Sequence, residues 1–463
     1  MSAPLRAGES VPDWDEAMAQ ATRKTLLVFS QTFVPDPAAV GQHMADVAVA
    51  MARRGHRVVV YTADRGYEDP SVRYPAREVL EGVEIRRLAL SSFGKRNLIT
   101  RALGTFTFMM QCLFIGLFTR NLGGIFFSTS PPLVGAAASV VRLLRGVPIA
   151  YWAMDLNPDQ LIAMGKIKAR SLTARVLELV NRFILRRTSL VIALDRFMAD
   201  RLRARGVADV KMEVLPPWSH EQHITDATDA EREGFRRRHG LAGKFVVMYS
   251  GNHSPANPLR TLLDAAVRLR DDDRLRFVFV GGGLGKREVE AVAREHELTN
   301  VVSLPYQPLE DLGASLGAAD VHVVSLGENM VGIIHPCKIY GAMTVGRPVL
   351  FLGPATSHVG DLLAGHGIGR RVSHGDVDGC VAAVRGLAGM PADELARVGA
   401  RATAVLRESL GQAMLCGRVC DALERVYGRA PRPVEPVTPR AVVGPAPVEN
   451  VIVPDERRVS CAR

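Results

Sequence analysis

The chain has little cysteine, and its cysteines are scattered. The six are Cys112, Cys337, Cys380, Cys416, Cys420 and Cys461. They form no Cys-x-x-Cys pair, so the sequence argues against the disulfide framework of a small secreted domain and indicates reduced thiols in a cytosolic protein. A signal peptide is also missing, because residues 1–24 are polar, mixed in charge and without an apolar central stretch. We interpret residues 1–24 as a tail.

Signals of nucleic-acid binding and of metal binding are absent as well. The sequence shows no zinc-ligand spacing, RNP motif or helix-turn-helix signature, although its net charge is +10 at pH 7. An excess of positive charge also suits an anionic membrane surface or a phosphorylated ligand. We therefore expect no nucleic-acid partner, no metal site and no cofactor, and we keep the other two partners as hypotheses.

The sequence does contain enough apolar residues for two globular domains. It has 463 residues, of which 47% are hydrophobic and 23% are charged. A strand at Thr25–Ser30, a helix at about Val40–Arg54 and a strand at Arg57–Tyr61 form a βαβ unit, which predicts a parallel sheet. Gly55 supplies the helix stop. Further strands are predicted at Val83–Leu88, Ile125–Ser128, Ile149–Trp152, Leu190–Ala193 and Lys211–Leu215.

A second series of strands and helices follows a polar stretch at Pro216–Gly240, where we place the domain boundary. Its strands are predicted at Phe245–Ser250, Arg276–Val280, Val301–Leu304, Val321–Ser325, Val349–Leu352 and Ile368–Val372. The predicted domains are residues 25–220 and 221–428, with the last helix able to pack back on the first domain. Residues 429–463 are rich in proline and are predicted to be a disordered tail. The predicted fold class is α/β, with two doubly wound, Rossmann-like domains facing each other across a cleft.

The stretch Gly327–Leu350 is the most informative part of the chain. A flexible loop at Gly327–Gly332 leads into a helix that we predict to begin at Pro336 and to stop at Gly346. Free N–H groups at such a helix start suit an anion. Lys338 falls in the first turn, where the helix dipole disfavours a cation. We therefore expect Lys338 to contact a bound phosphate; the alternative is a solvated surface lysine.

Several loops at the predicted carboxyl ends of strands carry polar residues or glycines. In the first half they are Gln31–Gly41, Ser128–Pro132 and Asp155–Asp159, although Pro, Asn, Asp and Ser are also common in ordinary turns. In the second half, Gly281–Gly285 follows a strand and would let the backbone approach a phosphate closely. This cluster lacks the full G-x-G-x-x-G spacing of a dinucleotide site.

Two segments of the first half suggest contact with a membrane. Ala102–Thr119 carries no charge, and Lys166–Arg187 mixes large apolar residues with seven basic ones. A membrane span at the first segment would separate strands of one sheet, so we expect a helix that is buried or dipped into the membrane interface. The alternative for the second is a basic solvated face over a core helix. Basic residues that flank the uncharged segment are Lys95, Arg96, Arg101 and Arg120.

The order of the motifs resembles that of a known enzyme family. The motifs are Arg54–Val60, Ser128–Pro132, Asp155–Pro158, Tyr249–Asn252, Phe279–Gly283, Ala318–Val321 and Gly346–Val349. Together they resemble the GT-B glycosyltransferases, specifically the retaining family-4 enzymes, over about Thr25 to Tyr427. Pro336, Lys338 and Tyr340 match a Pro-x-Lys-x-Tyr pattern of the subgroup that acts on lipid-linked sugars for bacterial surface polysaccharide.

The resemblance implies a sugar transfer from a nucleoside-diphosphate sugar to a saccharide or lipid-linked acceptor, with retention. It places the acceptor near Gln31–Gly41 and Asp155, and it makes Asp155, Glu328 and Lys338 the candidate catalytic residues. The implied donor-binding residues are Gly251, Asn252, Gly281, Gly282, Gly283, Tyr306, Gly332, His335 and Lys338. The implied location is the cytoplasm, with peripheral contact at the inner face of the plasma membrane.

The sequence departs from the family pattern at the charged positions. Asn252 and Asn257 stand where the family commonly has Arg and Lys, and the two family glutamates fall near Ile333 and Gly341. The diphosphate charge would then fall to the helix N-terminus and Lys338, with His253 or Arg347. These losses motivate a second hypothesis, a non-catalytic nucleotide-binding or scaffold protein. A third, a Rossmann-type oxidoreductase, is disfavoured because neither half has the dinucleotide fingerprint followed by its ribose-binding acid.

Overall fold

The computed structural model describes residues 24–36, 38–66, 71–89, 91, 98–220, 224 and 227–429. Most of the two expected tails lies outside the described residues, as do Cys461, Lys95 and Arg96. The side chain of Arg101 is outside this description too.

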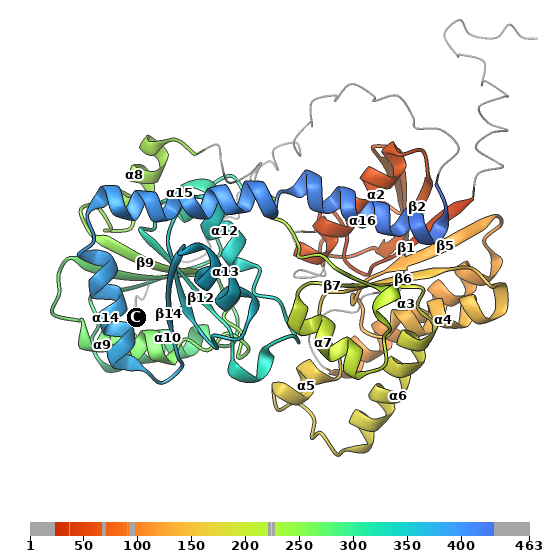
Figure 1. The fold of residues 1–463 in the computed structure, drawn as a ribbon, viewed down its shortest axis with the longest axis horizontal. Coiled ribbons are helices and arrows are strands. Elements are labelled where there is room, and N and C mark those ends of the chain that lie inside the picture. Colours follow the sequence, from red (N-terminus) through yellow and green to blue (C-terminus); the bar gives the residue numbers. More distant parts are fainter. Residues whose placement is uncertain are drawn as a thin grey trace, which may run out of the picture.

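The N-terminal domain is built on a sheet with the strand order β3-β4-β2-β1-β5-β6-β7-β8 (Figure 1). Its strands are β1 (Thr25–Phe29), β2 (Arg57–Ala63), β3 (Arg77–Leu80), β4 (Val83–Leu88), β5 (Leu122–Phe127), β6 (Ile149–Ala153), β7 (Leu190–Ala193) and β8 (Met212–Val214). The predicted βαβ unit is confirmed, because β1 pairs with β2 in parallel. The edge strand β3 pairs antiparallel to β4 and was not predicted.

The helices of this domain follow the predicted pattern. They are α2 (Ala39–Arg53), α3 (Leu98–Phe118), α4 (Val134–Arg145), α5 (Asp159–Ala163), α6 (Leu172–Arg187) and α7 (Arg196–Ala204), with a 3-10 turn η1 at Asp209–Lys211. In α2 one apolar face is buried, including Met44, Val47 and Met51. The chain leaves this helix through Gly55, whose φ of 92° suits glycine.

The C-terminal domain has a parallel sheet with the strand order β11-β10-β9-β12-β13-β14. Its strands are β9 (Phe245–Ser250), β10 (Leu275–Val280), β11 (Val301–Leu304), β12 (Val321–Ser325), β13 (Val349–Leu352) and β14 (Gly369–Val372). Each agrees with a predicted strand to within a residue. For β12 and β13 continuous burial explains the agreement, since both are buried at every position, as expected for strands covered on both faces.

Helices cover both faces of this second sheet. They are α8 (Asp229–Arg238), α9 (Arg260–Arg268), α10 (Lys286–Glu295), α11 (Leu312–Gly317), α12 (Lys338–Thr344), α13 (His358–His366), α14 (Val377–Ala388) and α15 (Ala392–Ser409), with a 3-10 turn η3 at Glu328–Met330. The last helix, α16 (Gln412–Tyr427), leaves this domain. The helix α8 lies in the polar stretch at Pro216–Gly240 where we placed the domain boundary, and it was not predicted. It has one buried residue, Phe235, and begins with a capping box of Thr228 and Glu231.

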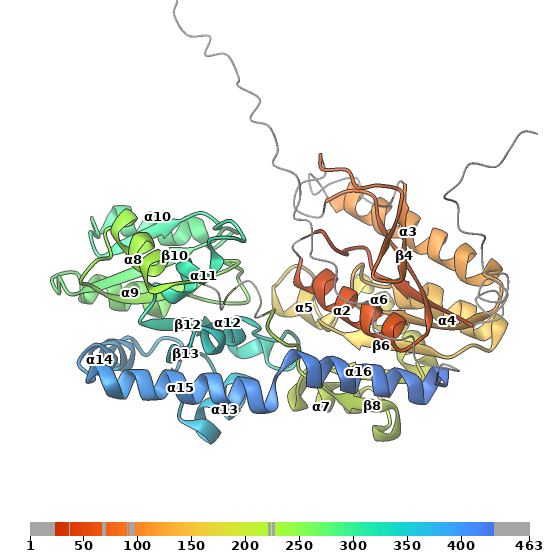
Figure 2. The same cartoon turned by 90° about the horizontal axis from the view of Figure 1, so that it is seen from above.

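Two features tie the domains together. The helix α15 packs on α12 and α13, and α16 continues across to pack on α2 of the N-terminal domain (Figures 1 and 2). At its end, the Tyr427 hydroxyl donates to the Ile125 carbonyl at 2.6 Å. The linker after β8 contacts both domains, because Trp218 donates to Asp46 at 2.7 Å and Ser219 accepts from Thr344 at 2.9 Å. The relative placement of the two sheets is therefore fixed at several points.

The helix α3, which contains the uncharged segment, has one buried and one exposed face. Phe108 and Cys112 are buried against the N-terminal core, and α3 packs on α4. The opposite face exposes large apolar side chains at Leu103, Phe106, Phe114 and Phe118. Within the described residues, no helix combines the length and apolar character needed to cross a bilayer.

Candidate functional site

Two loops of the C-terminal domain pack backbone against backbone at the carboxyl ends of β9 and β10. A Cβ at Gly281 would lie 2.2 Å from the Gly251 carbonyl oxygen, and a Cβ at Gly283 would lie 2.2 Å from Asn252 Oδ1. Both glycines also have positive φ, at 124° and 114°. Any other residue would push the loops apart, so these positions require glycine. The structure thus brings Gly251, Asn252 and the glycine cluster together, as predicted from sequence order.

Lys338 lies against these loops. A Cβ at Gly251 would lie 2.6 Å from Lys338 Cε, and Lys338 Nζ lies 5.5 Å from the centroid of the Tyr249 ring. Burial lowers the pKa of Lys338. No carboxylate pairs with this ammonium group in the described part of the chain. A half-buried cation without an acidic partner is costly unless an anion joins it.

Tyr306 completes this group of residues. A Cβ at Gly282 would lie 3.1 Å from the Tyr306 ring. Tyr306 itself is 59% exposed. An exposed aromatic ring beside a glycine loop offers an apolar face to a planar ligand. The predicted donor residues from Gly251 to Tyr306, together with Lys338, therefore form one surface.

The helix start differs from the prediction by two residues. The helix α12 begins at Lys338, whereas Pro336 lies in the preceding turn and its carbonyl accepts from Ile339 N at 3.3 Å. The proline still fixes the entry of the chain, but the turn before the helix is tighter than α-helical. The helix has only seven residues. We therefore base the anion site on Lys338 and the glycine loops rather than on a helix dipole. Gly346 stops the helix as predicted, with φ 63°.

Two further basic residues surround the glycine loop. Lys286 Nζ donates to the carbonyls of Gly281, at 2.6 Å, and Leu304, which fixes its charge at the base of the loop. Lys286 was not among the predicted site residues, although its position directly after the glycine cluster indicated a basic group beside that loop. His253 has a buried Nε2 without a hydrogen-bond partner among the described atoms, and burial lowers its pKa. Arg347, by contrast, lies beyond the far end of α12 and donates to Gly317 at 3.0 Å.

The loop before α12 is docked on the N-terminal domain. Asp155 and Ile334 form an antiparallel bridge, and Leu156 N donates to the Ile333 carbonyl at 2.9 Å. Asn329 and Val331 also contact the first domain, through the Ala163 carbonyl and Arg201 respectively. The candidate acceptor acid thus lies directly against the segment that leads to Lys338.

Burial raises the pKa of Asp155 to about 6. The Cys337 thiol lies within electrostatic reach of both Asp155 and Lys338, because the Lys338 charge lowers its pKa and the Asp155 charge raises it. Asp155, whose pKa is raised, and Lys338, which pairs with no carboxylate among the described residues, therefore come from the two domains to the same neighbourhood.

Gly332 and His335 lie at the contact between the domains. A Cβ at Gly332 would lie 2.5 Å from the Phe197 carbonyl oxygen, and the φ of 68° also favours glycine. The His335 ring uses both nitrogens within the protein, with Asp195 at 2.9 Å and the Tyr340 hydroxyl at 2.6 Å. Asp195 belongs to the first domain, so this buried contact joins the two domains beside Lys338.

The remaining predicted site residues lie around this contact. Glu328 is exposed in η3, at the end of β12. The loops after β1 and β5 touch, because Gln31 N donates to the Ser130 carbonyl at 2.7 Å. The positions expected for the family glutamates are not acidic: Ile333 is buried between the domains, and a Cβ at Gly341 would meet only Leu316, at 3.6 Å.

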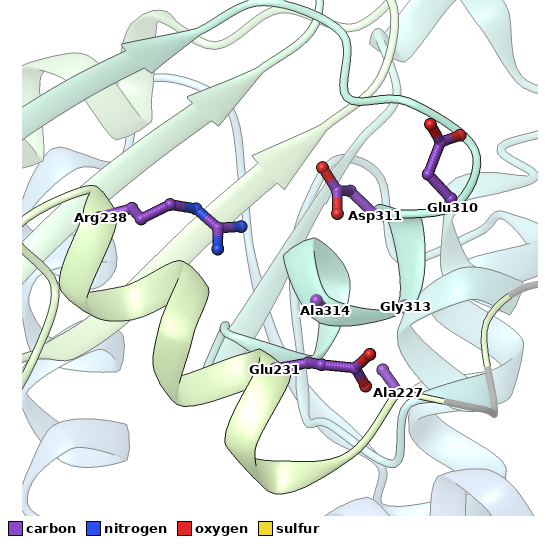
Figure 3. A pocket seen from close by; sticks show the side chains of 7 residues that line it. All are labelled: Ala227, Glu231, Arg238, Glu310, Asp311, Gly313 and Ala314. Carbon is purple, nitrogen blue, oxygen red and sulfur yellow. The ribbon is translucent and has the colours of Figure 1, made fainter.

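A separate hollow lies away from this site, between α8 and α11 (Figure 3). Glu231, Glu310 and Asp311 line it with Arg238, and its volume is about 180 Å³. This volume is below the usual range of ligand pockets, and its acidic lining does not suit a diphosphate. Within the described residues no group of three or more His, Cys, Asp and Glu side chains is placed to hold a metal ion. The loops at the domain contact remain the candidate site.

Comparison with known proteins gives two family matches. The glycosyl transferase 4-like domain matches residues 38–218, and the glycosyl transferases group 1 domain matches residues 231–353. Together they cover well over half of the chain.

Individual relatives are consistent with these matches. The chain is 25% identical over 374 residues to a putative colanic acid biosynthesis glycosyl transferase, WcaI of Escherichia coli (strain K12), covering 78% of this chain and 91% of that protein. It is 23% identical over 277 residues to a probable glycosyltransferase, WbjE of Pseudomonas aeruginosa, covering 59% and 68%. The fold is similar to that of Anabaena Alr3699/HepE in complex with UDP and glucose, with a TM-score of 0.64, 16% identity and coverage of 86% and 99%.

Proposed function

The chain belongs to the family-4 glycosyltransferases of the GT-B fold, and from this premise we propose that it transfers a sugar from a nucleoside-diphosphate sugar to a saccharide or lipid-linked acceptor. The pathway we propose is the synthesis of a surface polysaccharide, as the name of the Escherichia coli relative suggests. A nucleotide-sugar donor is supported by the UDP in the structure of the Anabaena protein.

One observation carries the donor assignment. Lys338 is a half-buried cation with a lowered pKa and no acidic partner among the described residues, and it lies against two loops whose glycines expose backbone. A diphosphate would supply the missing negative charge, and the loops would allow its close approach. The exposed Tyr306 ring would pack against the base or the sugar of the nucleotide.

The proposed chemical step uses Lys338 of the C-terminal domain and Asp155 of the N-terminal domain. The acceptor oxygen forms a bond to the anomeric carbon while the bond from that carbon to the diphosphate breaks. Lys338 neutralises the departing diphosphate, which is the largest stabilisation expected. Asp155 accepts the proton of the acceptor hydroxyl, and Glu328 contacts a hydroxyl of the donor sugar. Attack on the face from which the diphosphate leaves would retain the anomeric configuration without an enzyme nucleophile.

Calorimetry with UDP, GDP and ADP tests the donor site. We expect one of them to bind to the full chain with a single heat of binding. Release of the nucleotide from a panel of sugar nucleotides would then identify the sugar, and NMR of the product's anomeric proton would report retention. A folded sample that binds no nucleoside diphosphate would overturn the proposal. Binding without transfer to any acceptor would favour the scaffold hypothesis that the non-acidic Ile333 and Gly341 suggest.

We further propose that the N-terminal domain contacts an anionic membrane. The helices α3, α4 and α6 pack side by side (Figure 1) and expose large apolar residues. These are Leu103, Phe106, Phe114, Phe118, Leu143, Leu144, Leu172, Val176 and Leu179. Exposed basic residues lie on α6 and on the loop before it, including Lys166, Lys168 and Arg186. Exposed apolar side chains together with positive charge suit the interface of a bilayer with anionic lipid.

A further inference from the structure

A groove in the N-terminal domain lies beside the loop that holds Asp155. Its volume is about 420 Å³, within the range of small-molecule sites. It runs between α5, the loop after α5, α6 and the end of α7. Its apolar lining includes Ile162, Ala169, Ala174 and Leu179. An apolar lining of this kind accepts a hydrocarbon chain.

Three arginines line the same groove, and they are not equally paired. Arg205 pairs with Asp159 and lies 3.5 Å from Glu178, which also accepts from Arg182 at 3.0 Å. Arg175 has no ion-pair partner within the described residues. Arginine matches the geometry of a phosphate through two parallel hydrogen bonds. The groove therefore combines an apolar wall with a guanidinium group free to bind an anion.

The groove adjoins the site of sugar transfer. Pro158 lines the groove and lies on the loop that begins at Asp155. Tyr151 lies near both the Asp155 loop and the groove. Burial is the main cause that raises the pKa of the Tyr151 phenol. The Asp155 charge raises this pKa further, and the charge of Arg205, which lines the groove, lowers it. The Tyr151 phenol therefore lies within electrostatic reach of both Asp155 and the groove.

The groove also adjoins the exposed apolar face of α6. Arg175, Leu179 and Arg182 follow one another at helical spacing and so share one face. Leu179 is 66% exposed although it lines the groove, and its neighbours Leu172 and Val176 are exposed as well. A chain held in the groove could thus continue along α6 toward the proposed membrane contact.

We propose that this groove binds the phosphate group and the first hydrocarbon units of a lipid-phosphate-linked acceptor. Arg175 binds the phosphate, the apolar wall holds the chain, and the sugar hydroxyl of the acceptor reaches Asp155. The role as an acceptor site rests on the proposed function. The binding of a phosphorylated lipid does not, so it can be measured without sugar transfer.

Farnesyl diphosphate is a suitable probe, measured by calorimetry on the full chain in saturating UDP so that the donor site is occupied. We expect it to bind at least about ten-fold more tightly than farnesol, which lacks the phosphates, or inorganic diphosphate, which lacks the chain. Arg175→Ala should weaken binding about ten-fold through loss of the charge contact. Ala169→Trp should weaken it at least as much by filling the groove. The matched controls Arg237→Ala, in α8, and Ala208→Trp change exposed residues outside the groove and should bind like wild type.

Three results would overturn the groove assignment. They are no binding of farnesyl diphosphate by the folded wild type, equal losses in the control variants, and equal affinity for lysophosphatidylglycerol, which would indicate a general lipid site. UDP affinity, measured on the same samples, separates the two proposals. If farnesyl diphosphate binds as expected but no nucleotide does, the groove stands and the proposed donor site fails. If UDP binds and farnesyl diphosphate does not, the proposed donor site stands and the groove assignment fails.

Discussion

At the scale of single residues, Lys338 makes the donor site testable. A charge-assisted contact to phosphate contributes about 1.5–3 kcal/mol. Lys338→Ala should therefore weaken nucleoside-diphosphate binding about ten-fold or more, as measured by calorimetry. Binding of the nucleoside without phosphates should change little, because the lost contact is to the diphosphate.

Lys244→Ala is the matched control for Lys338. Lys244 lies at the start of β9 and its ammonium group donates to the Asp273 carbonyl at 2.7 Å, on an exposed surface. Its removal should leave nucleotide affinity unchanged. If Lys338→Ala also binds nucleotide like wild type, Lys338 is a structural lysine and the diphosphate contacts other groups.

Asp155 predicts a pH dependence. With a pKa raised to about 6 by burial, the carboxylate gains a proton as the pH falls through about 6. If Asp155 takes the acceptor proton, kcat/KM should fall below about pH 6. Asp155→Asn should lower turnover at least about ten-fold and leave nucleotide affinity intact. The fall in kcat/KM on the acid side of the pH profile, the acid limb, should also disappear in this variant. An acid limb that survives in Asp155→Asn would assign it to another group.

The same substitution should stabilise the protein at neutral pH. The folded pKa of about 6 lies above the ordinary value of 3.8, so the folded state favours the protonated form. The contribution of Asp155 to stability is therefore fully present below about pH 3.8 and is lost as the pH rises through about 6. At pH 7.5, Asp155→Asn should raise the free energy of unfolding by about 1–3 kcal/mol in urea titrations. The gain should disappear near pH 4. Greater stability with lower activity would mark a residue kept for function.

At the scale of elements, the pair of His335 and Asp195 holds the loop before α12 in place. Burial alone would raise the pKa of Asp195, but the hydrogen bond and charge of His335 lower it. The pairing therefore contributes fully above the ordinary pKa of aspartate and is lost as the pH falls through the lowered pKa of the folded state. Asp195 also caps α7 by accepting from Met198 N at 2.8 Å.

Two substitutions of Asp195 separate these roles. Asp195→Ser keeps a capping oxygen and removes the partner of His335, so the free energy of unfolding should fall by about 1–3 kcal/mol. Asp195→Ala should lower the free energy of unfolding by about 1 kcal/mol more than Asp195→Ser does, because it also removes the cap of α7. Urea unfolding measures both. If Asp195→Ser is as stable as wild type, the contact to His335 does not hold the domains together.

Elements with a continuous apolar run were predictable from the sequence, and two polar, weakly buried elements were missed. The central strands β10, β12 and β13 are buried at nearly every position, and their predicted positions were confirmed. The edge strand β3 alternates between exposed and half-buried residues, and α8 buries only Phe235. Neither offers a hydrophobic signal that stands out from a polar loop. For α8 the capping pair Thr228 and Glu231 was the available signal.

At the scale of the whole molecule, the sequence located the loops but not their contacts across the domains. The glycine cluster and Lys338 could be placed in one domain because parallel strands bring their carboxyl ends to one edge. The bridge of Asp155 with Ile334 depends on how two domains pack, which no local pattern encodes. For the same reason Gly332 and His335, predicted at the donor, could not be seen from the sequence to lie at the domain contact.

The proposed membrane surface is the property of several helices at once. Liposome flotation should recover the full chain with vesicles that contain anionic lipid, and less of it in high salt, because screening weakens the attraction of the basic residues. Replacing exposed apolar residues of α3 in the double variant Phe114→Ser and Phe118→Ser should reduce recovery several-fold, since both side chains are largely exposed and their burial in the interface is lost.

Leu309→Ser is the matched control, because Leu309 is 51% exposed but lies on the C-terminal domain, away from α3 and α6. It should float like wild type. Equal recovery with neutral and anionic vesicles would leave α6 as a basic face in water. Equal loss in the control and the α3 variant would show that flotation reports general hydrophobicity. Recovery that depends on α3 and on anionic lipid together would place the lipid-binding groove beside the bilayer, where a lipid-linked acceptor could enter it without leaving the membrane.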